Sequence, residues 1–178
     1  MKTRTSLVSL LSLFFLLNLN TASAQTTLAA GDLYITGHTA DNNASGNEEL
    51  RFTLLKAITS GTTIYFTDFG WESTNNDFQS ANPCGSSTGA VSDGIIKWVA
   101  SSAMSCGESV VMETSNSSGL SATKGTITGE QATYNSSTVY MNMSSGGEHI
   151  YAYQGSYASP TLIACTNYDG VYNGTLSE

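Results

Sequence analysis

Residues 38–52 place oxygen-bearing side chains at the spacing of a calcium-binding loop. In the stretch HTADNNASGNEELRF, Asp41, Asn43 and Ser45 take the first, third and fifth places, and a glycine at the sixth place allows a sharp turn. The twelfth place, which normally supplies a bidentate glutamate, is Phe52. The pattern therefore indicates either an incomplete cation site or a polar turn.

A calcium ion here would need a replacement carboxylate from Glu48 or Glu49. Residues 33–36 and 50–55, which flank the loop, alternate as strands do, so a true EF-hand with flanking helices is excluded. A looser calcium turn between strands stays open, with weak affinity of about 10⁻⁴–10⁻³ M. So does an ordinary hairpin loop, because Asn, Ser and Gly suit such loops without any ion. The calcium ligands would be Asp41, Asn43, Ser45 and Glu49.

Two tyrosines form a second candidate site. Tyr151 and Tyr153 alternate with Ile150 and Ala152 in an expected strand over 149–154, so the tyrosines share one face. If the smaller side chains face the core, the tyrosines form an exposed platform on which the sugar rings of a ligand could stack. In the alternative, the tyrosines themselves cover the core and their hydroxyl groups reach its rim.

Catalytic motifs are sparse. His38 and His149 are the only histidines, and no G-x-S-x-G or HExxH motif is present. Glu48 and Glu49 are adjacent along an expected strand, so their side chains point to opposite faces. They cannot converge on one glycosidic bond, which excludes the simplest glycosidase site.

The three cysteines predict one disulfide and a leftover thiol. Residues 72–94 show no strand pattern and hold Cys84, whereas Cys106 lies before a later strand. A Cys84–Cys106 disulfide would tether this loop and contribute about 3 kcal/mol in the chain-entropy model. Cys165 shares a strand face with Ile163, so we expect a small buried core residue that is bonded to neither.

The N-terminus has the features of a secretory signal. Lys2 and Arg4 precede an apolar run over 7–17, and the small-x-small sequence Ala-Ser-Ala ends at Ala24. The run is too short to span a membrane. We expect cleavage after Ala24, which leaves one extracellular domain over 25–178.

The mature chain is strongly acidic. Removing the two basic residues of the signal leaves four against 14 acidic ones, a net charge of about −10. Such a surface repels nucleic acid and anionic lipid, which excludes both as partners. We also expect no membrane insertion after cleavage of the signal.

Short apolar runs separated by Gly, Asn, Asp and Ser predict an all-β chain. About eight short strands of this kind favour an antiparallel, immunoglobulin-like β-sandwich. Trp98 shares a strand face with Ile96, so its ring should fill the space between the sheets, and we expect both Trp98 and Trp71 to be largely buried. The predicted strands are 33–36, 50–55, 62–67, 95–99, 109–113, 138–143, 149–154 and 161–165.

Three segments resemble an uncharacterised β-sandwich domain of secreted bacterial multidomain proteins. They are GTTIYFTDFGW (61–71), GIIKWVASSAMSCGESVVM (94–112) and MNMSSGGEHIYAYQGSYASPTLIA (141–164). The usual pattern includes GTTIYFTD-x-GW and SGDQ-x-x-AYQG, and the segment order also resembles the lamin-tail domain. Two departures stand out: Glu148-His149 replaces Asp-Gln, and related domains continue beyond this hairpin, which leaves open that the chain is a fragment.

The resemblance implies an extracellular sandwich and no catalytic residues. We therefore expect a non-catalytic adhesion, binding or spacer module of a secreted or surface protein, with a glycan or protein ligand. One alternative is a carbohydrate-binding module of a longer enzyme. The other is a secreted hydrolase.

Overall fold

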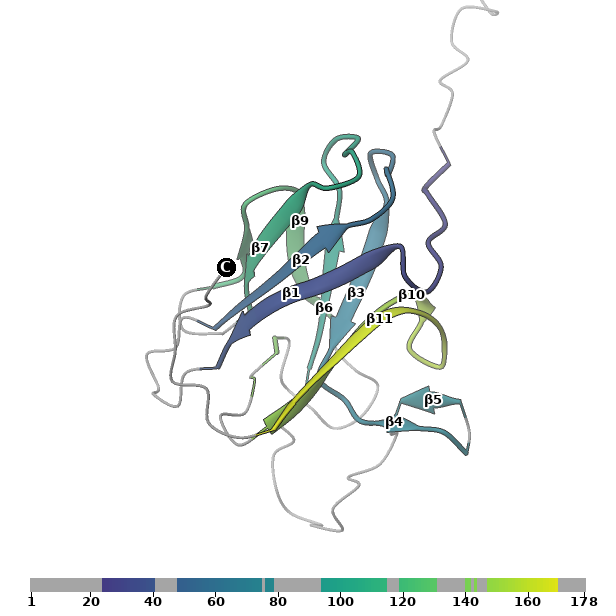
Figure 1. Ribbon diagram of the computed structural model, residues 1–178, viewed down its shortest axis with the longest axis vertical. Coiled ribbons are helices and arrows are strands. Elements are labelled where there is room, and N and C mark those ends of the chain that lie inside the picture. The colour runs from purple at the N-terminus through teal and green to yellow at the C-terminus, as the bar shows by residue number, and fades with distance from the viewer. Residues whose placement is uncertain are drawn as a thin grey trace, which may run out of the picture.

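The chain is an all-β protein built from two packed antiparallel sheets, a β-sandwich. The computed structural model describes residues 24–40, 48–74, 76–78, 94–114, 119–130, 140–141, 143 and 147–169. In Figure 1 the first sheet crosses in front of the second, and a small separate hairpin lies beside them. The predicted fold class is confirmed, and its immunoglobulin-like character stays a prediction.

The first sheet has four strands in the order β1-β2-β7-β8. Its core-facing residues alternate with polar ones, as the sequence pattern requires. In β2, Leu50, Phe52 and Leu54 are fully buried, whereas the residues between them are partly exposed. The strands are β1 (Leu33–Thr39), β2 (Glu49–Leu54), β7 (Ser109–Glu113) and β8 (Ser121–Ala122).

The second sheet has five strands in the order β11-β10-β3-β6-β9. Its inner face packs on the first sheet, and its outer face carries the candidate site described below. The two-stranded hairpin of β4 (Trp71–Glu72) and β5 (Asp77–Phe78) lies over that outer face. The five strands are β11 (Ser159–Asp169), β10 (Gly147–Ser156), β3 (Thr63–Thr67), β6 (Ile95–Val99) and β9 (Thr126–Glu130).

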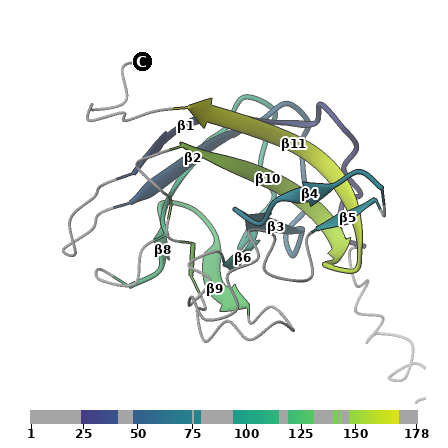
Figure 2. The same ribbon diagram turned by 90° about the horizontal axis from the view of Figure 1, so that it is seen from below.

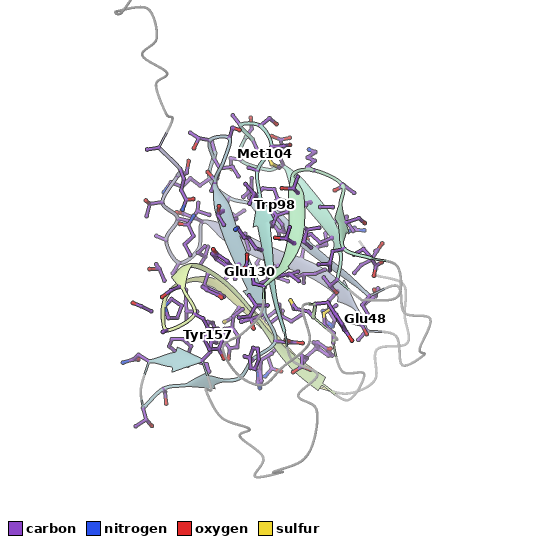
Figure 3. All side chains as sticks on the ribbon, turned by 180° about the vertical axis from the view of Figure 1, so that it is seen from behind. Glu48, Trp98, Met104, Glu130 and Tyr157 are labelled. Carbon is purple, nitrogen blue, oxygen red and sulfur yellow. The ribbon has the colours of Figure 1, made fainter. Side chains whose placement is uncertain are left out.

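Trp98 lies at the centre of the core between the sheets (Figure 3). Its ring is fully buried and meets Phe52 of the other sheet edge-on, with ring centroids 5.2 Å apart. The indole N–H donates to the carbonyl of Lys124 at 2.7 Å, so the polar atom of the ring is satisfied. The predicted burial of Trp98 is confirmed, and Ile96 shares its inward face.

The strand predictions were accurate where alternation was strong. The runs 95–99 and 109–113 match β6 and β7, and the others except 138–143 lie within one or two residues of a strand or fall inside a longer one. Residues 140, 141 and 143, the described part of 138–143, belong to no strand, although Met141 and Met143 are buried. The prediction missed β4, β5, β8 and β9.

A β-bulge in β11 corrects the prediction for Cys165. Ala152 pairs with Ala164, but Tyr153 pairs with Leu162, so Ile163 is an extra residue between them. One extra residue reverses which face the later side chains take. Ile163 is buried but Cys165 is exposed, so the predicted core position of Cys165 is wrong.

Candidate functional site

A second apolar cluster covers the outer face of the five-stranded sheet, separate from the sandwich core. We call it the outer aromatic cluster. Figures 1 and 2 show the β4–β5 hairpin beside the turn that joins β10 and β11, where this cluster lies. Its buried members are Phe69, Phe78, Ile95 and Tyr153, and its partly buried members are Tyr65, Trp71, Tyr151, Tyr157 and Leu162.

Phe78 is the centre of the outer aromatic cluster. It is fully buried, with ring centroids 5.1 Å from Tyr153, 5.3 Å from Tyr157 and 5.2 Å from Trp71. Because aromatic pairs contribute about 0.5–1.5 kcal/mol beyond their buried area, these contacts fix a short hairpin that has only two residues in each strand. Aromatic contacts, rather than a long series of backbone hydrogen bonds between strands, therefore hold the hairpin in place.

The two tyrosines of the predicted platform differ in exposure. Ile150 and Ala152 face the sandwich core and are fully buried, so Tyr151 and Tyr153 face outward together, as the platform interpretation required. However, the hairpin covers Tyr153, which is only 1% exposed, and leaves Tyr151 partly buried. Tyr153 is therefore a buried member of a second core, and an exposed two-tyrosine platform is wrong.

Burial also governs the tyrosine hydroxyl groups. It raises the pKa of Tyr153 well above its ordinary value, and neighbouring Tyr65, Tyr157 and Glu130 raise it further. Burial raises the pKa of Tyr151 too, while a hydrogen bond to the Trp71 backbone acts in the opposite direction. Both phenols are neutral near pH 7.

Partly exposed side chains lie next to the buried Tyr153 on the same sheet face. Tyr65 stacks on Tyr153 with ring centroids 5.2 Å apart and pairs with Lys97 across the next strand. The Lys97 ammonium lies 3.3 Å from the carboxylate of Glu130, and these side chains are 34% and 40% exposed. Such an exposed ion pair contributes little to stability, so both groups remain available for hydrogen bonds to a ligand.

These side chains together form what we call the outer binding strip: Tyr65, Trp71, Tyr151 and Tyr157, with Lys97 and Glu130. Figure 3 places Tyr157 near the hairpin and Glu130 farther along the same side of the molecule. Aromatic faces offer stacking surface, and the ion pair offers both donors and acceptors. The arrangement suits a ligand with apolar faces and many hydroxyl groups. Trp71, which the sequence predicted to be largely buried, is partly buried and packs against Phe78.

The predicted calcium ligands are not brought together in the part of the chain that the structure describes. Asp41, Asn43 and Ser45 lie outside it, and Glu49 is on β2, where its backbone N–H donates to the Thr39 hydroxyl at 2.9 Å. Within the described residues, no group of three His, Cys, Asp or Glu side chains could hold a metal ion. The calcium site therefore stays a prediction.

The buried carboxylate at this end of the sandwich is Glu48 rather than Glu49. Glu48 is 2% exposed and accepts a hydrogen bond from the Met143 backbone at 2.8 Å. Asp68, also 2% exposed, accepts one from the Gly94 backbone at 2.6 Å. Charge-assisted bonds of this kind hold connecting segments in place. These two carboxylates have a structural role that sequence patterns did not reveal.

The structure describes two of the three cysteines, Cys106 and Cys165. Cys106 is exposed and forms no disulfide in the described part of the structure, where its sulfur lies 3.2 Å from the Leu55 carbonyl. Cys84 lies outside the described residues, so the Cys84–Cys106 disulfide stays a prediction. Cys165 is a free, exposed thiol. That it is bonded to neither Cys84 nor Cys106 stays a prediction.

The two histidines lie apart from the outer binding strip or at its margin. His38 stacks on Tyr168 between the sheets, with ring centroids 3.9 Å apart. His149 is exposed on β10, and its ring centroid is 6.4 Å from that of Tyr151.

Sequence reasoning also missed Gln154, which lies within the AYQG motif. The residue is 6% exposed, and its side-chain amide forms three hydrogen bonds, to Leu28, Thr26 and Thr63. The motif was recognised, but a pattern does not show which distant segments its glutamine contacts.

No family model, curated protein or solved structure matches this chain. The described part of the chain contains no helix with the length and apolar character needed to cross a membrane.

Proposed function

We propose that this chain is a non-catalytic, extracellular β-sandwich module that binds a glycan on its outer binding strip. The observation that carries the proposal is that the partly buried Tyr65, Trp71 and Tyr157 belong to one outer cluster, in which Tyr65 pairs across strands with Lys97 of the Lys97–Glu130 ion pair. Sugar rings present C–H faces that stack on aromatic rings, and hydroxyl groups that bond to both ions of such a pair.

Charge favours an uncharged glycan over an anionic polymer. The chain carries 14 acidic residues and six basic ones, so a polyanion would be repelled at long range. Lys97 is also neutralised by Glu130 rather than standing in a basic patch. An adhesion or spacer role within a larger secreted protein is compatible with the same surface.

The ionisable groups elsewhere support a non-catalytic role. The buried carboxylates of Glu48 and Asp68 accept hydrogen bonds from backbone N–H groups, which positions loops. On the surface, Lys124 pairs with Glu108 at 2.7 Å, and Lys56 pairs with Asp32 at 2.9 Å. Each of these groups has a local structural function.

Glycan-array binding by the purified secreted protein tests the proposal, followed by calorimetry with any oligosaccharide that binds. We expect Tyr65→Ala and Lys97→Ala each to weaken binding at least about tenfold, which corresponds to about 1.4 kcal/mol. Tyr34→Ala is the matched control, because Tyr34 is a 62% exposed aromatic residue on the other sheet.

Two results would overturn the proposal. One is the absence of glycan binding by a folded protein. The other is binding that Tyr34→Ala weakens as much as Tyr65→Ala does. Melting curves must show that each variant is folded, because Tyr65 also packs against the buried Tyr153.

A further inference from the structure

The segment before β1 is fastened to the sandwich by the buried side chain of Gln154, together with more exposed bonds from Thr59, Thr62 and Lys56. The Gln154 amide oxygen accepts from the Leu28 N–H at 2.8 Å, and its nitrogen donates to the carbonyls of Thr26 at 3.0 Å and Thr63 at 2.9 Å. The Thr26 N–H also donates to the hydroxyl of Thr62 at 3.1 Å. Because Gln154 is buried, these bonds are shielded from water.

The fastened part begins close to the expected signal cleavage site. Leu28 is 1% exposed and Thr26 is partly buried, whereas Ala24 and Gln25 are exposed. Cleavage after Ala24 would leave Gln25 as a one-residue extension beyond the first anchored residue. The new N-terminal residue would therefore be exposed to solvent, because the bond of Thr26 to Gln154 holds the next residue in place.

We propose that Gln25, once it is the N-terminal residue, cyclises to pyroglutamate; this rests on the secretion that is part of the proposed function. The free α-amino nitrogen attacks the side-chain carboxamide carbon of the same residue. A C–N bond closes a five-membered lactam, the bond to the amide nitrogen breaks, and ammonia leaves. No oxidant, reductant or second substrate is needed.

The structure leaves room for this reaction. Ring closure uses only atoms of Gln25, which is exposed, so the bonds of Thr26 and Leu28 to Gln154 are unaffected. The product has no α-amino charge and is not a substrate for ordinary aminopeptidases. The clamp at Gln154 then protects the residues that follow. Together the two features give the mature protein a blocked and fastened N-terminus.

Secretion of the full precursor from a host that cleaves signals, followed by intact mass and N-terminal peptide mass, tests the proposal. We expect a chain that begins at residue 25 and is lighter than its unmodified form by one ammonia molecule. A chain that begins at Gln25 and keeps its amine after storage at neutral pH would overturn cyclisation alone. A different N-terminus would overturn the assigned site, and a cell-retained precursor would instead contradict secretion.

A matched variant tests the clamp. Gln25→Ser leaves a free amine, and we expect an aminopeptidase to remove only the first residue or two before it meets the clamped segment. Adding Gln154→Ala should let trimming continue past Leu28. Equal trimming with and without Gln154 would overturn the protective role. If Gln154→Ala does not fold, Thr62→Val removes one anchoring bond and serves as the second test.

Discussion

His38 of β1 stacks on Tyr168 of β11, with ring centroids 3.9 Å apart and planes 25° from parallel, and this contact joins the edges of the two sheets. Burial lowers the pKa of the His38 imidazole below its ordinary value of 6.5. Burial, together with Glu148, Glu48 and Asp68, raises the pKa of Tyr168. Both rings are therefore neutral in the folded protein near pH 7.

This pair predicts a loss of stability in mild acid. Because the folded pKa of His38 is lower than the unfolded one, the unfolded chain binds the proton first as pH falls. The contribution is complete above pH 6.5 and is lost as pH falls through the folded pKa. Urea unfolding of the wild type and His38→Phe at pH values on both sides of 6.5 measures it. The variant keeps a ring against Tyr168, so it should lose less stability; an equal loss would contradict the assignment.

Trp98→Ala should lower the free energy of unfolding by about 3–5 kcal/mol, because it empties the centre of the core. Trp98→Phe is the control: it keeps most of the apolar volume and loses the bond to the Lys124 carbonyl, which is worth about 1 kcal/mol. Chemical denaturation gives both values. Near-native melting of Trp98→Ala would show that the core is centred elsewhere.

Two glycines should lose very different amounts of stability when they are replaced by alanine. A Cβ on Gly94 would lie 1.7 Å from the Tyr140 carbonyl oxygen, so Gly94→Ala must move backbone and should cost more than about 3 kcal/mol. Gly31 has open space around it and a φ of +90°, so Gly31→Ala should cost only about 1 kcal/mol of backbone strain. Thermal melts of both variants test the order, and the reverse order would refute the close passage at Tyr140.

The thiol of Cys165 should react in the folded protein because it is exposed. Alkylation without denaturant, followed by non-reducing peptide mapping, should label Cys165 and show whether Cys84 and Cys106 are bonded, as we predict. Cys165→Ser identifies the labelled peptide. Labelling of Cys165 only after denaturation, or its recovery in a disulfide with Cys84 or Cys106, would contradict the assignment.

Calcium binding at residues 41–49 is predicted to be weak, with a dissociation constant of about 10⁻⁴–10⁻³ M. Millimolar calcium should then raise the melting temperature, and chelator should reverse the rise. Asp41→Ala should abolish it, because Asp41 is the first ligand of the loop. If calcium leaves the melting temperature unchanged, residues 41–49 form a polar turn and no calcium site.

The sandwich was predictable because its strands alternate strictly. Leu50, Phe52 and Leu54 mark one inward face, and Ile96 and Trp98 mark the other. Strands such as β9 were missed because their inward positions are only partly buried, so alternation is weak there. The predicted burial of Cys165 was wrong for a different reason. A single extra residue, Ile163, reverses the sheet face on which the side chain of Cys165 lies, and the sequence pattern gives no sign of it.

The outer binding strip was only partly predictable. Alternation with Ile150 and Ala152 correctly placed Tyr151 and Tyr153 on the outward face. That rule treats a strand as having one core side and one solvent side. It contains no information on a distant hairpin that folds back and covers Tyr153 with Phe78. Long-range packing of this kind leaves no periodic signal.

The bonds that hold residues 26–28 also determine where mechanical tension enters the domain. A pull on the N-terminus of a tethered protein reaches Thr26 and Leu28 first. Their bonds pass it to Thr59 and Thr62, which precede β3, and to Gln154 in β10, which also bonds to Thr63 in β3. These two strands are adjacent within the five-stranded sheet, whereas β1 is an edge strand of the other. Force is thus delivered to the interior of the larger sheet, and β1 is spared from being peeled off one bond at a time.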